Sequence, residues 1–276
     1  MLKQRVITAV FLLLAFLSAI FLLPLLGWIA VATLVASLAA WEWGGLMLWS
    51  KTARVALGLG TAAYCLLITL LQPALVGLER GAELARGVAL GHYLPAALFW
   101  IILVPFWLRQ RWPLKGAVIG LAVGAVVLLP TWLALVQLRQ LGPWTLLGLM
   151  AVVWIADIAA YFSGRAFGKH KLAPQISPGK TWEGAAGAVV GVVAYGLLLR
   201  GLNPALAALG GLFGATLALL LLTSVSIAGD LFESLLKRQA GIKDSSQLLP
   251  GHGGVLDRID SLTSTLPLVA VTWLFL

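Results

Sequence analysis

Residues Ser234 to Asp260 read SLLKRQAGIKDSSQLLPGHGGVLDRID, and this charged stretch separates two strongly apolar segments. It mixes cationic side chains with carboxylates, and the glycines Gly251, Gly253 and Gly254 surround His252. Anionic phosphates need positive donors and a divalent cation, carboxylates bind such a cation, and glycines let backbone N–H groups approach an oxygen closely. The residues therefore favour phosphate chemistry, whereas a solvated loop between membrane helices is the simpler alternative.

The rest of the chain is far more apolar than a soluble domain. Of its 276 residues, 61% are hydrophobic and 11% are charged, whereas soluble domains carry about 25% charged residues. At about 20 residues per span, the apolar runs predict an all-α bundle of about nine transmembrane helices. We expect spans at 6–23, 28–49, 53–72, 88–108, 116–136, 144–162, 184–199, 205–229 and 262–276.

Little chain remains for a separate soluble domain. We therefore expect one integral-membrane catalytic domain over residues 1–276, with polar segments near 157–184 and 230–260. The first apolar run is longer than the hydrophobic region of a signal peptide, which favours a retained helix. The single cysteine, Cys65, leaves neither a disulfide framework nor a thiolate metal site, and we interpret it as a small core residue.

Basic residues predict the orientation. Of the 19 lysines and arginines, 15 fall in the N-terminal segment and in every second connection after it. The positive-inside rule then puts the N-terminus and residues 230–260 in the cytoplasm and the C-terminus outside. These features predict a multi-pass protein of the cell (inner) membrane.

Acidic residues cluster at the same predicted face, with eight of the ten in cytoplasmic ends or loops. A charge at mid-bilayer costs about 2.5–3.5 kcal/mol on insertion scales, so carboxylates inside apolar runs need a reason. Two tryptophans flank Glu42, and we interpret it as an interfacial carboxylate that reaches the headgroups. For Asp157 and Asp230 we favour a functional role.

A second polar segment spans residues 157–184. Its Gly179-Lys180-Thr181 run is not a P-loop. That motif needs a glycine five positions before Gly179, where this chain has Pro174, and it needs a preceding strand, which a helical membrane protein does not supply. Ser177 is instead predicted to cap the seventh helix, with Pro178 in its first turn. Lys180 and Thr181 would then lie beside free N–H groups that attract an anion. An ordinary helix start with an interfacial lysine is the alternative.

Together the two polar segments resemble those of the phosphatidate cytidylyltransferases (CDP-diacylglycerol synthases). The first stretch covers 27 of the 276 residues and matches the family signature without departure, at Ser234, Leu236, Lys237-Arg238, Lys243-Asp244, Pro250, His252-Gly253-Gly254 and Asp257-Arg258-Ile259-Asp260. The second matches the family's Ser-Pro-x-Lys-Thr-x-Glu-Gly element at Ser177, Pro178, Lys180, Thr181, Glu183 and Gly184.

The resemblance implies transfer of the cytidylyl group of CTP to phosphatidate, giving CDP-diacylglycerol and pyrophosphate, with Mg²⁺ as cofactor in one or two copies. Asp257 and Asp260 are three residues apart and share a face if the last helix begins there. We expect the catalytic residues to be Asp230, Lys237, Asp257 and Asp260, of which Asp230, Asp257 and Asp260 bind metal. We expect substrate contacts from Ser177, Lys180, Thr181, Arg238, Lys243, Asp244, His252, Gly253, Gly254 and Arg258.

Two other classes of function compete with this one. An ion-coupled transporter would place acidic residues near the bilayer midplane, often on broken helices in two repeated halves. A membrane scaffold would leave the dense polar loop without a purpose. Expected partners are CTP, phosphatidate and membrane lipids, with no nucleic acid. Rows of glycine at 116–124 and 187–191 permit close packing within one chain or in a homodimer.

Overall fold

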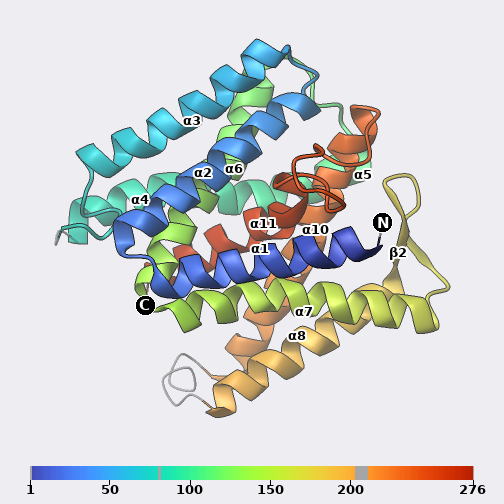
Figure 1. The fold of residues 1–276 in the computed structure, drawn as a ribbon. Coiled ribbons are helices and arrows are strands. Elements are labelled where there is room, and N and C mark those ends of the chain that lie inside the picture. Colours follow the sequence, from blue (N-terminus) through green and yellow to red (C-terminus); the bar gives the residue numbers. More distant parts are fainter. Residues whose placement is uncertain (1, 80–81, 203–210, 276) are drawn as a thin grey trace.

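The computed structural model describes residues 2–79, 82–202 and 211–275, and helices dominate it (Figure 1). Each of the nine expected spans contains a helix, and residues 205–210 of the eighth lie outside the described residues. In chain order the elements are α1 (Leu2–Leu22), α2 (Leu25–Leu46), α3 (Lys51–Leu71), α4 (Ala82–Leu98), the π-helical turn η1 (Phe99–Leu103), α5 (Val104–Gln110), α6 (Ala117–Gln140), α7 (Pro143–Phe167), β1 (Lys171–Ala173), β2 (Ser177–Thr181), α8 (Trp182–Leu202), α10 (Leu212–Gln239) and α11 (Leu256–Trp273).

Seven helices of the described chain are long and apolar enough to cross a membrane: α2, α3, the continuous helix Ala85–Gln110, α6, α7, α8 and α10. The apolar part of α1, Val6–Leu22, is shorter. Helix α11 carries three charged residues in its first two turns and is largely buried by its neighbours. The chain is a multi-pass membrane protein, as the composition predicts.

Helix α11 lies at the centre of the bundle, where it packs against α2, α4, α6, α7 and α10. Its serines bond backbone oxygens of α10: Ser261 Oγ donates to Ser226 O at 3.1 Å, and Ser264 Oγ to Val225 O at 2.9 Å. A Cβ on Gly229 would lie 2.5 Å from Ser264 Oγ. Only glycine therefore permits this close crossing of α10 and α11.

The two rows of glycine pack within the chain. A Cβ on Gly124 of α6 would lie 2.7 Å from Trp43 Nε1 of α2, and one on Gly191 of α8 would lie 2.8 Å from Ala159 Cβ of α7. Trp43 Nε1 also donates to Gly120 O at 2.9 Å. These contacts use the glycines without a second copy, so they lend no support to the homodimer, which stays a prediction.

The polar segments and the N-terminus gather at one end of the bundle. In Figure 1 the start of α1, the α2–α3 turn, the β1–β2 hairpin and the loop before α11 lie to the right and upper right, whereas the α3–α4 connection and the C-terminus lie at the left and lower left. The segments that are rich in basic residues therefore lie at one end of the bundle, and the connections between them that are poor in basic residues lie at the other.

The start of the seventh expected helix corrects the sequence interpretation. Ser177 is not its cap, because residues 177–181 form strand β2, which pairs antiparallel with β1. The helix begins at Trp182, and Thr181 Oγ1 accepts a hydrogen bond from Gly184 N at 3.1 Å. Pairing with β1 satisfies the backbone of 177–181, which local capping rules do not detect. Other helix limits also differ from the expected spans. In the polar region, α10 runs ten residues beyond 229, to Gln239, and α11 begins at Leu256 rather than 262.

We predict that Gly229→Ala destabilises the protein by about 1–3 kcal/mol, because the added methyl overfills the α10–α11 crossing. The matched control is Gly214→Ala in the same helix, where nothing lies within 4 Å of the added Cβ. That control should be neutral or stabilising, since alanine favours helix. Melting temperatures of the two purified variants provide the comparison, and equal values would contradict a close crossing at Gly229.

Candidate active site

A cavity of about 500 Å³ opens between α7, α8, α10 and the β1–β2 hairpin. Its polar lining includes Asp157, Arg165, Ser177, Lys180, Thr181 and Asp230, and its apolar lining includes Ala156, Ala160 and Ile227. Lys180 Nζ forms an ion pair with Asp230 Oδ2 at 2.6 Å, and Ser234 Oγ donates to Asp230 Oδ1 at 3.2 Å. The cavity thus combines charged and apolar side chains in one lining.

The hairpin that carries Lys180 is held at two places. At its base, His170 Nδ1 lies 2.6 Å from Glu183 Oε1 in the first turn of α8, and the His170 backbone N–H also donates to that carboxylate. Nearer its tip, Arg238 Nε of α10 donates to Ile176 O at 3.4 Å. Arg238 therefore contacts the hairpin backbone, and His170 helps to position the hairpin.

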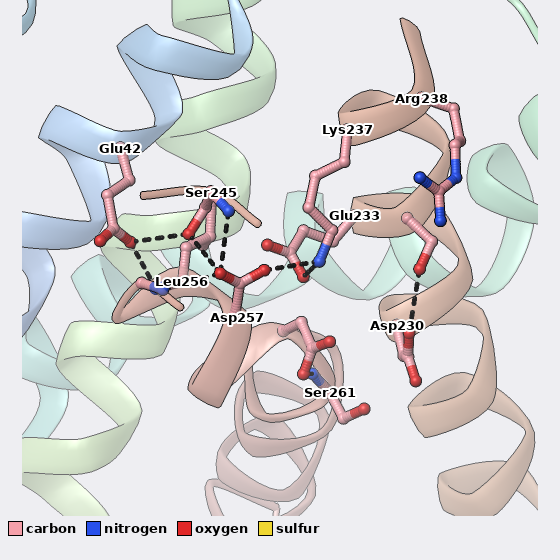
Figure 2. A network of polar contacts seen from close by, with 12 residues as sticks. Glu42, Asp230, Glu233, Lys237, Arg238, Ser245, Leu256, Asp257 and Ser261 are labelled. Atoms are coloured by element: carbon pink, nitrogen blue, oxygen red, sulfur yellow. Dashed lines mark hydrogen bonds and ion pairs between the residues drawn. The ribbon is translucent and has the colours of Figure 1, made fainter. Parts of the chain in front are cut away.

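Asp257 is the centre of a second polar network, at the start of α11 (Figure 2). Its Oδ1 accepts from Lys237 Nζ at 2.6 Å. Its Oδ2 accepts from Ser245 N and Gly254 N, both at 2.8 Å, and from Ser245 Oγ at 2.9 Å. Burial raises the pKa of Asp257, but the hydrogen bonds and the charge of Lys237 outweigh it, so the pKa falls below its ordinary value.

Lys237 connects Asp257 to a third carboxylate, because its Nζ also donates to Glu233 Oε2 at 3.0 Å. The other oxygen, Glu233 Oε1, is buried and has no hydrogen-bond partner. Asp260 lies nearby on α11, and its Oδ1 accepts from Ser261 N at 2.7 Å. Burial and the negative charge of Asp230 together raise the pKa of Asp260 to about 7. This region therefore holds more carboxylate than its own donors satisfy.

Glu42 was missed as a site residue. It is not an interfacial carboxylate, because its side chain is fully buried and accepts hydrogen bonds from Val255 N at 2.9 Å and Leu256 N at 2.6 Å. Figure 2 shows Ser245 between Glu42 and Asp257. A glutamate inside an apolar run was the only sequence signal, and its partners lie more than 200 residues away.

The family model described as "Cytidylyltransferase family" matches residues 3–276. The chain belongs to the cytidylyltransferase family. A phosphatidate cytidylyltransferase of Pseudomonas aeruginosa is 44% identical, with 98% of this chain and 96% of that protein aligned. A phosphatidate cytidylyltransferase of Haemophilus influenzae is 34% identical, with 100% of this chain and 99% of that protein aligned. One of Brucella suis is 47% identical, with 70% of this chain and 66% of that protein aligned.

The structure of this cytidylyltransferase-family member brings together part of the expected site. Ser177, Lys180, Thr181 and Asp230 line the main cavity, and the charges of Lys180 and Arg258 both act on Asp157. Arg165, also in the lining, was not expected. Lys243 and Asp244 lie elsewhere, in a hollow beside Trp41 and Arg54.

The signature glycines serve the network around Asp257. Gly253 has a φ of +78°, and a Cβ there would lie 2.6 Å from Asp257 Oδ2. The Gly254 N–H approaches a carboxylate of the chain itself, whereas we had expected these glycines to expose N–H groups to a phosphate. His252 Nδ1 has only a long contact, 3.4 Å, with Pro250 O. Contacts of these residues with substrate stay a prediction.

We predict that Asp257→Asn lowers stability as well as activity. The asparagine NH₂ group would face either Lys237 Nζ or Ser245 N, both of which are donors. Breaking the buried ion pair with Lys237 should lower the free energy of unfolding by about 3–5 kcal/mol. The control is Asp244→Asn, because Asp244 is exposed. Melting curves test this, and equal melting temperatures for the two variants would contradict the structural role of Asp257.

Proposed function

We propose that this chain transfers the cytidylyl group of CTP to the phosphate of phosphatidate, giving CDP-diacylglycerol and pyrophosphate. The carrying observation is that relatives aligned over nearly their whole length are phosphatidate cytidylyltransferases. The cavity supports the proposal, because a lipid phosphate needs both a cationic end and an apolar path. A transporter is disfavoured, since the carboxylates of the described cavity lie with residues of the hairpin. The loop of residues 240–255 between α10 and α11, called the signature loop below, is at the same end of the bundle (Figure 1).

The reaction places a simple demand on the protein. The nucleophile is a phosphate monoester with a second pKa near 6, so it is largely dianionic at neutral pH and needs no general base. The obstacle is repulsion between a lipid phosphate and a triphosphate. Positioning and charge neutralisation therefore supply the catalysis, as in other phosphoryl-transfer enzymes. Lys180 and Arg165, which both line the cavity, are suited to that role.

The ion pair between Lys180 and Asp230 suggests how substrate is accepted. In the structure the ammonium group neutralises the Asp230 carboxylate at 2.6 Å. Asp230 would hold a cation that neutralises its carboxylate, and Lys180 would then be available to contact a phosphate. Binding of cation and nucleotide would then support each other, because each needs a partner that the other frees.

Mg²⁺ is the proposed cofactor, although no group of three or more acidic, histidine or cysteine side chains in the described residues is already arranged around a metal position. Asp230 and Asp260 fit such a cation, because burial and the charge of Asp230 disfavour the ionised form of Asp260, and a cation would offset both. The neighbouring Glu233 Oε1 is buried and has no donor among the described residues, so this region is short of positive or donor groups. Asp257 fits less well, because four hydrogen bonds occupy its two oxygens. When bound, the cation would supply further charge neutralisation at the phosphates.

An assay with purified protein tests the proposed function. Pyrophosphate release should require both CTP and phosphatidate and should be slower with the other three nucleoside triphosphates. Release without phosphatidate, or equal use of all four nucleotides, would refute the proposal.

Lys180→Ala should lower kcat/KM about ten- to hundredfold, the effect of losing one charge-assisted contact of roughly 1.5–3 kcal/mol. The matched control is Lys171→Ala in the paired strand, because Lys171 is opposite Thr181 but does not line the cavity. Equal losses in the two variants would indicate a general basic surface instead.

We also propose that the cavity faces the cytoplasm from the cell (inner) membrane, among membrane lipids. Cysteines at Gln247 and Glu79, both exposed, should label from opposite sides of sealed vesicles. Cys65 is buried and can be replaced by alanine to remove background. A membrane-impermeant thiol reagent applied from the cytoplasmic side should modify only the cysteine at position 247. Modification of only the cysteine at position 79 would show that the proposed orientation is reversed.

A further inference from the structure

Glu42 is the only fully buried carboxylate among the described residues, and it lies outside the main cavity. Its Oε1 accepts from Ser246 Oγ at 2.6 Å and from Val255 N at 2.9 Å. Its Oε2 accepts from Leu256 N at 2.6 Å and from Ser245 Oγ at 3.2 Å. All four donors come from the signature loop or the first residue of α11, so one side chain of α2 holds both ends of the segment Ser245–Leu256.

This arrangement depends on the conformation of the loop. No ion pair of the described residues involves Glu42, so its charge is balanced by hydrogen bonds and by the N-terminal end of α11. A buried charge without such partners is very unfavourable. The carboxylate is therefore accommodated only while the segment from Ser245 to Leu256 remains folded over it.

Ser245 links Glu42 to Asp257, the centre of the second network. Its hydroxyl lies 3.2 Å from Glu42 Oε2 and 2.9 Å from Asp257 Oδ2, and its single proton can be donated strongly to one of them at a time. Asp257 in turn orients Lys237 through Oδ1. A displacement of the Glu42 carboxylate thus reaches Lys237 through two intervening side chains.

Gly254 gives independent support. A Cβ on this residue would meet Ser245 Oγ and Glu42 Oε1, and it would lie 2.7 Å from Glu42 Cδ. Its φ is not in the left-handed region, so backbone conformation alone does not require glycine there. The signature glycine is explained by the space that the carboxylate from α2 and the Ser245 hydroxyl bound to it occupy.

We infer that Glu42 is a positioning residue for the cytidylyl transfer: it fixes the signature loop on the start of α11 so that Asp257 holds Lys237 in place on α10, about two turns after Asp230 of the cavity. The inference rests on the proposed function. Glu42 itself lies away from the cavity, so it acts through the loop and should affect kcat more than the KM for CTP.

The test compares Glu42→Gln with Glu79→Gln, an exposed glutamate outside the site. The glutamine amide end would face two donors of the loop, so we expect kcat per folded molecule to fall about ten- to hundredfold while KM for CTP changes less than threefold. Hydrogen exchange of the Val255 and Leu256 amides should accelerate in the same variant. The control should match the wild type in both measurements.

A purely structural role gives a different result. The melting temperature of Glu42→Gln would fall, but kcat per folded molecule, measured well below that temperature, would equal the wild-type value and overturn the inference. If Glu42→Gln does not fold, Ser245→Ala replaces it, with Ser224→Ala as the control for loss of a hydroxyl. Ser245→Ala should lower kcat about three- to tenfold, and wild-type kcat would equally overturn the inference.

Failure of the proposed function is distinguishable from failure of this inference. A wild-type protein without CTP- and phosphatidate-dependent turnover refutes the function. The exchange measurement then decides the positioning role alone: faster exchange at Val255 and Leu256 in Glu42→Gln supports it, and unchanged exchange refutes it.

Discussion

A carboxylate removed from water must be surrounded by donors, and the polar end of this bundle is built around that constraint. Asp257 and Glu42 each have four donor contacts, and the two carboxylates share one of these donors, the Ser245 hydroxyl. Most of these donors are backbone N–H or serine O–H groups of a single loop. The loop has little regular structure of its own, so the two buried charges, one from α2 and one from α11, give it a defined shape.

The close crossing of α10 and α11 has the complementary effect on the remaining carboxylates. Gly229 and the α11 serines bring the helix backbones together one residue before Asp230. Asp230 and Glu233 of α10 are thereby brought near Asp260 of α11. Burial and repulsion from Asp230 raise the pKa of Asp260. The same contact that stabilises the bundle therefore concentrates negative charge, which a divalent cation would relieve.

The hairpin adds the cationic side of the cavity. Lys180 extends from β2 towards Asp230, and the hairpin is anchored to α8 through His170 and Glu183. Apolar residues of α7 and α10 line the same cavity as these charges. A phosphate carried on a lipid would meet both surfaces at once, which explains why a membrane protein would make its polar site between helices rather than on a separate soluble domain.

The sequence by itself determined the helical membrane class, the approximate position of every span and the family, because hydropathy and the signature at residues 234–260 are local properties of the chain. It also led to Ser177, Lys180, Thr181 and Asp230, which the structure gathers into one cavity. The tertiary structure alone decided that residues 177–181 are a strand, because their backbone pairs with β1 rather than starting a helix. It also decided the environment of Glu42. No pattern around Glu42 indicates its donors, since they come from a loop more than 200 residues further along the chain and meet it only when α2 and α11 pack together.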